Sequence, residues 1–182
     1  MKKVLVPLAP GFEEIEAITV IDILRRAGVE VVAAGTVSGP IEASRKTKHL
    51  PDCTLDDVHA EDFDLLVLPG GQPGTNNLRA DPRLKRIIET LRAKNRPVAA
   101  ICAAPTVLSA YGLLAGRTAT SHPSVRHELT AGTLSDARVV VDGPVVTSQS
   151  AGTAMEFAFK LVELLCGPAK AAEVNKGVLA RL

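Results

Sequence analysis

Short apolar runs alternate with helix-forming segments along the chain, and this alternation restricts the fold more than any other feature. Strands are predicted at residues 3–9, 29–35, 64–68, 97–101 and 117–121, with a hairpin over 139–148. Helices are predicted at residues 13–27, 81–95, 105–111, 153–166 and 169–182. Strands that alternate with helices indicate a parallel sheet with right-handed crossovers and helices on both faces. The fully apolar run 65–68 agrees, because both faces of such a sheet are covered.

The segment 36–62 is the least regular part of the chain, and it is expected to form short strands and turns at one edge of the sheet. No long polar linker divides the sequence. We therefore predict one α/β domain over residues 1–182.

The composition excludes several classes of protein. Apolar residues make up 46% of the chain and charged residues 23%, which is typical of a soluble globular protein. Lys and Arg number 21 against 20 Asp and Glu, so no excess positive charge is available for nucleic acid or an anionic membrane. Aromatic residues are 3%, and no apolar run approaches the ~18 residues of a membrane helix. We expect neither nucleic acid nor membrane as a partner.

The chain has three cysteines, Cys53, Cys102 and Cys166. An odd number excludes a fully paired disulfide framework, and no spacing suggests a metal site. Cys53 is expected in a loop or edge strand, and Cys166 in the core at the end of an apolar helix. At least one free thiol favours a reducing compartment, so a cytoplasmic location is expected.

Cys102 lies where a nucleophile could be displayed. It directly follows an apolar strand and precedes two alanines and Pro105, a sequence suited to a sharp strand-to-helix turn. The amide groups of a helix N-terminus would favour the thiolate and lower the pKa of the thiol. The alternative is a buried cysteine that acts only as a small hydrophobe. The local pattern leaves both open.

Two further side chains are candidates for proton transfer at the same edge of the sheet. Glu16 has apolar neighbours, and if it is half-buried its raised pKa would let it donate a hydrogen bond to a thiolate. Glu13 and Glu14 are expected to face water beside the helix N-terminus. His122 follows a short strand and could serve as general base or thiolate partner. A solvated Glu16 is the alternative.

A glycine pair after the third main strand could supply backbone donors. Gly70 and Gly71 lack the flanking residues of a dinucleotide or P-loop motif, so a phosphate cradle is only weakly indicated. We expect instead that these N–H groups, with that of Ala103, form an oxyanion hole beside Cys102.

Six segments, taken together, resemble the ThiJ/PfpI family, in the branch of the Parkinson-disease-associated protein deglycase and its bacterial relatives. They are residues 10–16, 25–28, 67–71, 99–105, 120–123 and 147–148. Their order and spacing match that branch over nearly the whole chain.

The resemblance implies a flavodoxin-like α/β sandwich that works as a homodimer, without metal or organic cofactor. It matches Cys102 to the family's reactive, oxidation-prone cysteine, Glu16 to the carboxyl that hydrogen-bonds its sulfur, and His122 to the nearby histidine. Gly71 and Ala103 match the backbone donors beside that cysteine.

Arg45 matches an arginine that approaches the partner subunit's site in relatives. The sequence departs from the family pattern at two places. Ala43 replaces a cysteine that relatives often have, and residues 150–152 read Ser-Ala-Gly in place of Gly-Pro-Gly, which changes the pocket near His122. Some bacterial relatives lack that histidine, so its presence favours the catalytic variant.

The leading prediction is an enzyme of stress defence that converts methylglyoxal or glyoxal to lactate or glycolate through Cys102. Glycated amines or thiols are possible substrates of the same chemistry. The alternative is a non-enzymatic oxidative-stress sensor or chaperone that uses an oxidisable Cys102. Amide hydrolysis is less favoured.

Overall fold

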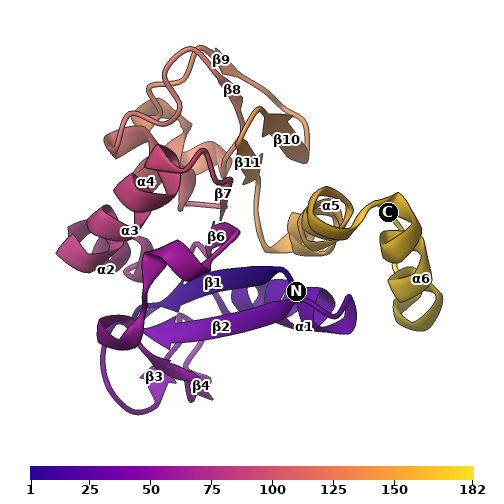
Figure 1. The fold of residues 1–182 in the computed structure, drawn as a ribbon. Helices are drawn as coiled ribbons and strands as arrows, with labels where there is room; N and C mark the ends of the chain where they lie inside the picture. Colours follow the sequence, from indigo (N-terminus) through magenta and orange to yellow (C-terminus); the bar gives the residue numbers. More distant parts are fainter.

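A computed structural model describes residues 1–182, and its centre is a seven-stranded sheet (Figure 1). The strand order is β10–β11–β7–β6–β1–β2–β5. The strands are β1 Lys3–Leu8, β2 Glu30–Gly35, β5 Cys53–Thr54, β6 Leu65–Leu68, β7 Val98–Ile101, β10 Val139–Asp142 and β11 Val145–Ser148. All neighbours are parallel except β10 and β11, which form the predicted hairpin. The predicted α/β fold with a mostly parallel sheet is confirmed.

Helices cover both faces of the sheet. One face carries α1 Glu14–Arg26, α5 Ala154–Cys166 and α6 Pro168–Val178; the other carries α2 Gly74–Ala80, α3 Pro82–Ala93 and α4 Pro105–Ala110. Along β1 the side chains alternate between the layers, with Val4 and Val6 in the first core and Leu5 in the second. Because successive side chains of a strand point to opposite faces, the apolar strands supply both cores at once.

The irregular stretch after β2 behaves as predicted. It forms the antiparallel pair β3 Ile41–Glu42 and β4 Lys48–His49, the edge strand β5, and the 3-10 turns η1 Leu55–Asp57 and η2 Ala60–Asp62. Cys53 lies half-buried in β5, as expected for an edge strand.

Four expectations are wrong in detail. The strand expected at 117–121 is only β8 Thr118–Ala119, which pairs with β9 Thr133–Leu134 outside the main sheet. Helix α2 was not predicted, because its sequence has no apolar periodicity. Helix α6 ends at Val178, where Leu179 takes the left-handed conformation. Cys166 is exposed rather than in the core, because it ends α5 on the side facing solvent.

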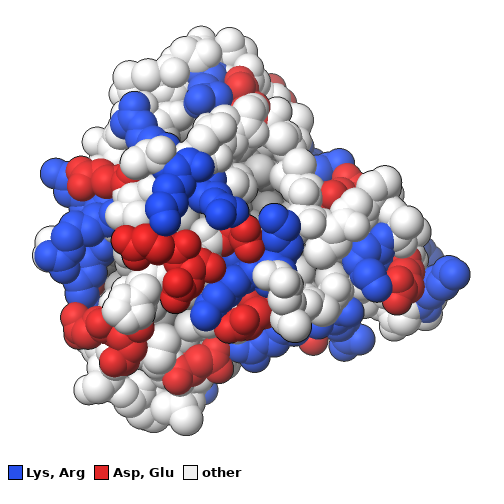
Figure 2. All heavy atoms as spheres, in the orientation of Figure 1, with Lys and Arg blue, Asp and Glu red and all other residues white.

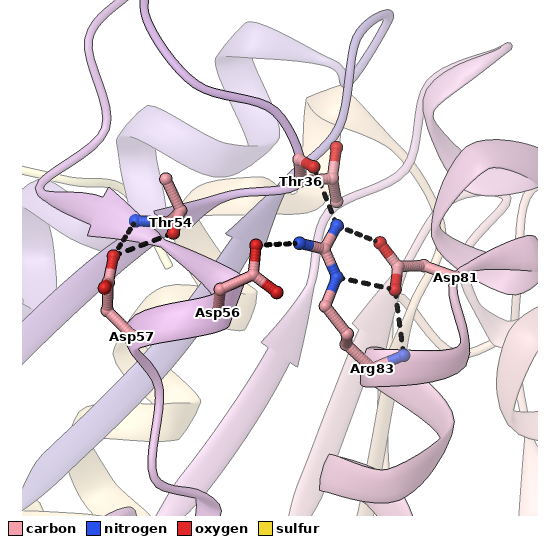
Figure 3. Close-up of polar contacts among 6 residues, drawn as sticks. All are labelled: Thr36, Thr54, Asp56, Asp57, Asp81 and Arg83. Carbon is pink, nitrogen blue, oxygen red and sulfur yellow. Dashed lines mark hydrogen bonds and ion pairs between the residues drawn. The ribbon is translucent and has the colours of Figure 1, made fainter.

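A guanidinium clamp joins the irregular stretch to the start of α3 (Figure 3). Arg83 donates to both carboxylate oxygens of Asp81 at 3.0 and 2.6 Å and to Asp56 at 2.8 Å. It also donates to the backbone carbonyl of Thr36 at 2.7 Å. Such bidentate pairing fixes three segments that are far apart in sequence around one side chain.

Positive and negative side chains are interspersed on the face shown in Figure 2. This mixture agrees with the formal net charge of +1. None of the helices combines the length and the apolar composition needed to cross a bilayer.

Candidate active site

The loops that follow β1, β6 and β7 meet at the carboxyl edge of the sheet, where ligands bind in open α/β folds. They surround a hollow of about 510 Å³. Six of the seven predicted site residues line it: Glu16, Arg45, Gly71, Cys102, Ala103 and His122. The seventh, Gly70, lies directly beneath Cys102 and Glu16.

Cys102 occupies a sharp turn between β7 and α4. Its φ of +64° is a left-handed conformation that is uncommon for a residue with a side chain. The turn is held by backbone hydrogen bonds on both sides: Cys102 N–H donates to the Ser148 carbonyl at 3.0 Å, and its own carbonyl accepts from His122 N–H at 2.9 Å. This geometry leaves the thiol half-buried and facing the hollow.

Glu16 is buried on α1, with only 1% of its surface exposed. Its Oε2 accepts a hydrogen bond from Gly70 N–H at 2.8 Å, whereas Oε1 is buried without a hydrogen-bond partner. Burial raises the pKa of Glu16 to about 7, against the opposing effects of the Cys102 thiol and Gly70 N–H. The negative charge of Glu13 raises it further. Glu16 can therefore hold or release a proton near neutral pH.

The predicted lowering of the Cys102 pKa is wrong. The Ala103 and Gly71 N–H groups do lower it, but burial and the negative charge of Glu16 outweigh them and raise the pKa to about 12. Once Glu16 is ionised, the pair therefore carries one negative charge on the carboxyl, next to a protonated thiol. Transfer of one proton from sulfur to the carboxyl would place that charge on Cys102.

The two glycines leave no space for a side chain. A Cβ at Gly70 would lie 2.7 Å from Cys102 Cβ and 2.7 Å from Glu16 Oε2. Gly71 has a φ of +87°, and a Cβ there would lie 2.4 Å from Glu13 N. Since the Gly70 N–H is bound to Glu16 and the Gly71 N–H points to Cys102, this loop serves the cysteine and offers no free phosphate cradle.

His122 also lines the hollow, and its ring is held at Nδ1. Its Nδ1 accepts from Ser124 N–H at 3.2 Å and lies 2.7 Å from the Ser124 hydroxyl. His122 thereby caps the 3-10 turn η3 Pro123–Glu128. Ser124, which also lines the hollow, is a functional candidate that the sequence did not suggest.

Glu13 and Glu14 do not simply face water, contrary to the prediction. The Ser44 hydroxyl donates to Glu13 at 2.7 Å and to Glu14 at 3.0 Å, and Arg45 N–H donates to Glu14 at 3.0 Å. These bonds hold the loop that presents Arg45 at the rim of the hollow. Only the adjacency of the two acids hinted at this role, because the loop lies about thirty positions away.

No three His, Cys, Asp or Glu side chains converge in a way that could hold a metal ion. The hollow instead offers one thiol, one buried carboxyl, one imidazole and inward-facing backbone donors. This set can perform nucleophilic addition to a carbonyl and proton transfer.

Residues 2–164 match the DJ-1/PfpI family. Protein dj-1beta of Drosophila melanogaster is 42% identical over 181 residues, covering 98% of this chain and 97% of that protein. A Caenorhabditis elegans protein named glutathione-independent glyoxalase DJR-1.2 is 40% identical over 172 residues, covering 93% and 91%. Among solved structures, oxidized Toxoplasma gondii DJ-1 superposes with a TM-score of 0.96 at 37% identity, with both chains fully covered.

Proposed function

The chain belongs to the DJ-1/PfpI family, and from this premise we propose that it is a glutathione-independent, cofactor-independent enzyme that converts methylglyoxal or glyoxal to hydroxy acids. The observation that carries the proposal is the placement of Cys102, Glu16 and His122 around one hollow. A relative named as a glutathione-independent glyoxalase supports it. The activity would reside in a single domain of residues 1–182.

In the first step the Cys102 sulfur adds to the aldehyde carbon. The thiol proton passes to Glu16, which can take it because burial holds its pKa near 7. Addition puts negative charge on the former aldehyde oxygen, and return of the proton from Glu16 to that oxygen completes the hemithioacetal and restores the carboxylate for the next step. The N–H groups of Gly71 and Ala103, which face the sulfur, would stabilise that charge.

In the second step a proton moves from the former aldehyde carbon to the neighbouring carbonyl carbon, with Glu16 and His122 as the groups that assist the transfer. One carbon is oxidised and the other reduced, so no outside oxidant is required. The product is a thioester of Cys102 with a 2-hydroxy acid. Water then adds to the thioester, lactate or glycolate leaves, and the thiol is restored.

The test is to incubate the purified protein with methylglyoxal without glutathione and to quantify lactate. We expect lactate from the wild type and none from Cys102→Ser. Cys166→Ser is the matched control, because Cys166 is exposed at the far end of α5 and should retain full activity. Absence of lactate from the wild type would refute the proposal.

A separate question is whether the enzyme acts on the free dicarbonyl alone or also on glycated amines and thiols. A glycated amine or thiol is itself a substrate only if Cys102 attacks the adduct directly. A chemical trap that captures free dicarbonyl distinguishes the two routes. If a purified adduct is still turned over in the presence of the trap, Cys102 attacks the adduct directly. Turnover that disappears means that only the free dicarbonyl is used.

An oxidative-stress sensor is the second candidate, favoured by the half-buried Cys102 thiol with backbone donors and a carboxyl proton beside it. These groups could hold the oxygens of a sulfinate. Its signature would be a gain of two oxygens at Cys102 after peroxide treatment in a protein that forms no lactate.

We also propose a homodimer in a reducing compartment such as the cytoplasm. A second hollow, of about 450 Å³, lies beside α1 and is lined by Ile15, Ile18 and Met155. These side chains are 55%, 38% and 36% exposed, and such an apolar patch suits a protein interface. Ile15 also lines the reactive hollow, so a partner would abut its rim.

Light scattering tests this assembly. The wild type should have the mass of a dimer and Ile18→Glu that of a monomer. Val37→Glu, at an apolar position in the loop after β2 that is 45% exposed, should stay dimeric. A monomeric wild type would refute the dimer.

A further inference from the structure

We propose that Ser124 fixes neutral His122 as the tautomer with its proton on Nε2. His122 then works as a hydrogen-bond donor toward the substrate oxygen rather than as a base. This inference rests on the proposed function for its catalytic consequence, but the tautomer itself is a property of the resting protein.

The geometry begins with the backbone. His122 N–H donates to the Cys102 carbonyl at 2.9 Å, which ties the histidine to the turn that carries the thiol. On the other side, His122 Nδ1 caps η3 by accepting from Ser124 N–H at 3.2 Å. The ring is therefore oriented by its own neighbours on both sides.

The backbone donor decides the position of the ring proton. A peptide N–H can only donate, so Nδ1 must offer its lone pair to Ser124. The Ser124 hydroxyl, 2.7 Å from the same nitrogen, can also donate and reinforces this state. In a neutral imidazole one nitrogen carries the proton and the other accepts, so the proton lies on Nε2.

Nε2 is then the ring nitrogen that is free for a substrate, since His122 lines the hollow and Nε2 has no partner within the protein. With its proton in place it cannot accept another, but it can donate to the oxygen that gains charge when Cys102 adds to the aldehyde. The proton-accepting group in the hollow is then Glu16, whose Oε1 has no hydrogen-bond partner. The structure thus separates the roles of the two residues.

A direct test is long-range ¹⁵N–¹H NMR of the wild-type protein at a pH where the ring signals show neutral histidine. The His122 signals are identified by their loss in His122→Gln. We expect an unprotonated Nδ1 and a protonated Nε2. A proton on Nδ1 would overturn the inference, and this readout is independent of whether lactate is formed.

The Ser124 hydroxyl is tested with Ser124→Ala and Ser124→Thr. Ser124 is exposed and its backbone N–H remains in both variants, so loss of the hydroxyl should lower kcat about fivefold, the equivalent of one ordinary hydrogen bond. KM should stay constant, the retained backbone N–H should keep the tautomer signal of the wild type, and Ser124→Thr should have the wild-type kcat. If alanine leaves kcat unchanged, the hydroxyl has no positioning role and that part of the inference is overturned. If KM rises instead, Ser124 binds substrate directly and the assignment is wrong.

Discussion

Replacing Glu16 by glutamine should stabilise the fold at pH 8 while it removes the proposed proton carrier of the site. Burial raises the pKa of Glu16 from its ordinary 4.5 to about 7. Each pH unit between those values corresponds to about 1.4 kcal/mol, so ionising Glu16 costs the folded state about 3 kcal/mol. Glutamine keeps an oxygen for Gly70 N–H and adds an NH₂ group that can face the Cys102 sulfur.

The sign of the pH dependence follows from the direction of the shift. Because the folded pKa is raised, the stabilising contribution of Glu16 is complete below pH 4.5 and is lost as the pH rises through 7. The wild type and Glu16→Gln should therefore be similar in stability near pH 4.5. Near pH 8 the variant should be more stable by about 3 kcal/mol.

Urea unfolding at pH 4.5, 6, 7 and 8 measures this difference, and the titrating groups that do not interact with Glu16 cancel between the two proteins. Glu14→Gln is the matched control. Hydrogen bonds to its carboxylate from the backbone, Thr47 and Ser44 outweigh burial and lower the pKa of Glu14, so its loss should destabilise the fold at pH 8. Parallel stability profiles for the wild type and Glu16→Gln would refute the reasoning.

Three further predictions follow from single contacts. Gly70→Ala should lose activity and about 2 kcal/mol of stability, because its Cβ would lie 2.7 Å from Cys102 Cβ. Gly177→Ala is the control, because its Cβ would lie in open space, and it should be neutral or slightly stabilising. Thermal unfolding measures both variants. Arg83→Ala should cost about 2 kcal/mol in urea unfolding, because it leaves the Asp81 carboxylate, whose side chain is 10% exposed, without its guanidinium partner. In Glu16→Gln, iodoacetamide should alkylate Cys102 faster at pH 8, because a negative neighbour no longer raises the thiol pKa. Peptide mass spectrometry measures the rate, and a slower rate than in the wild type would contradict the prediction.

The fold was largely predictable because apolar periodicity is local information. The runs that became β6 and β7 are short and fully apolar, β1 is apolar after Lys3, and the structure buries them between two helical layers. Helix α2 was not predicted because Gly74 and its polar neighbours have no apolar periodicity. Its position depends on packing against α3 and α4, which a local pattern does not encode.

The convergence of the candidate site residues was predictable from the sequence, but their energetics were not. Strand ends of a parallel sheet converge, so Cys102, Glu16 and His122 could be expected to meet at one edge. The direction of the shift in the thiol pKa could not be predicted in the same way, because it depends on how deeply Glu16 is buried beside the thiol. Likewise, nothing in the sequence indicated that Ser124 would hydrogen-bond Nδ1 of His122 rather than point to solvent.

The arrangement around Cys102 makes the fold less stable than the same sheet would be without it. Cys102 is held in a left-handed conformation, which costs a non-glycine residue about 1 kcal/mol or more. Glu16 is buried with one oxygen unpartnered, at a further cost of about 3 kcal/mol above neutral pH. Neither feature helps the two cores pack, since apolar side chains would fill the same space without these penalties. Both bring a thiol, a proton carrier and backbone donors into one hollow, and this is the geometry that addition to a carbonyl requires. The strain and the buried charge therefore point to chemistry at Cys102 more strongly than the presence of the cysteine itself.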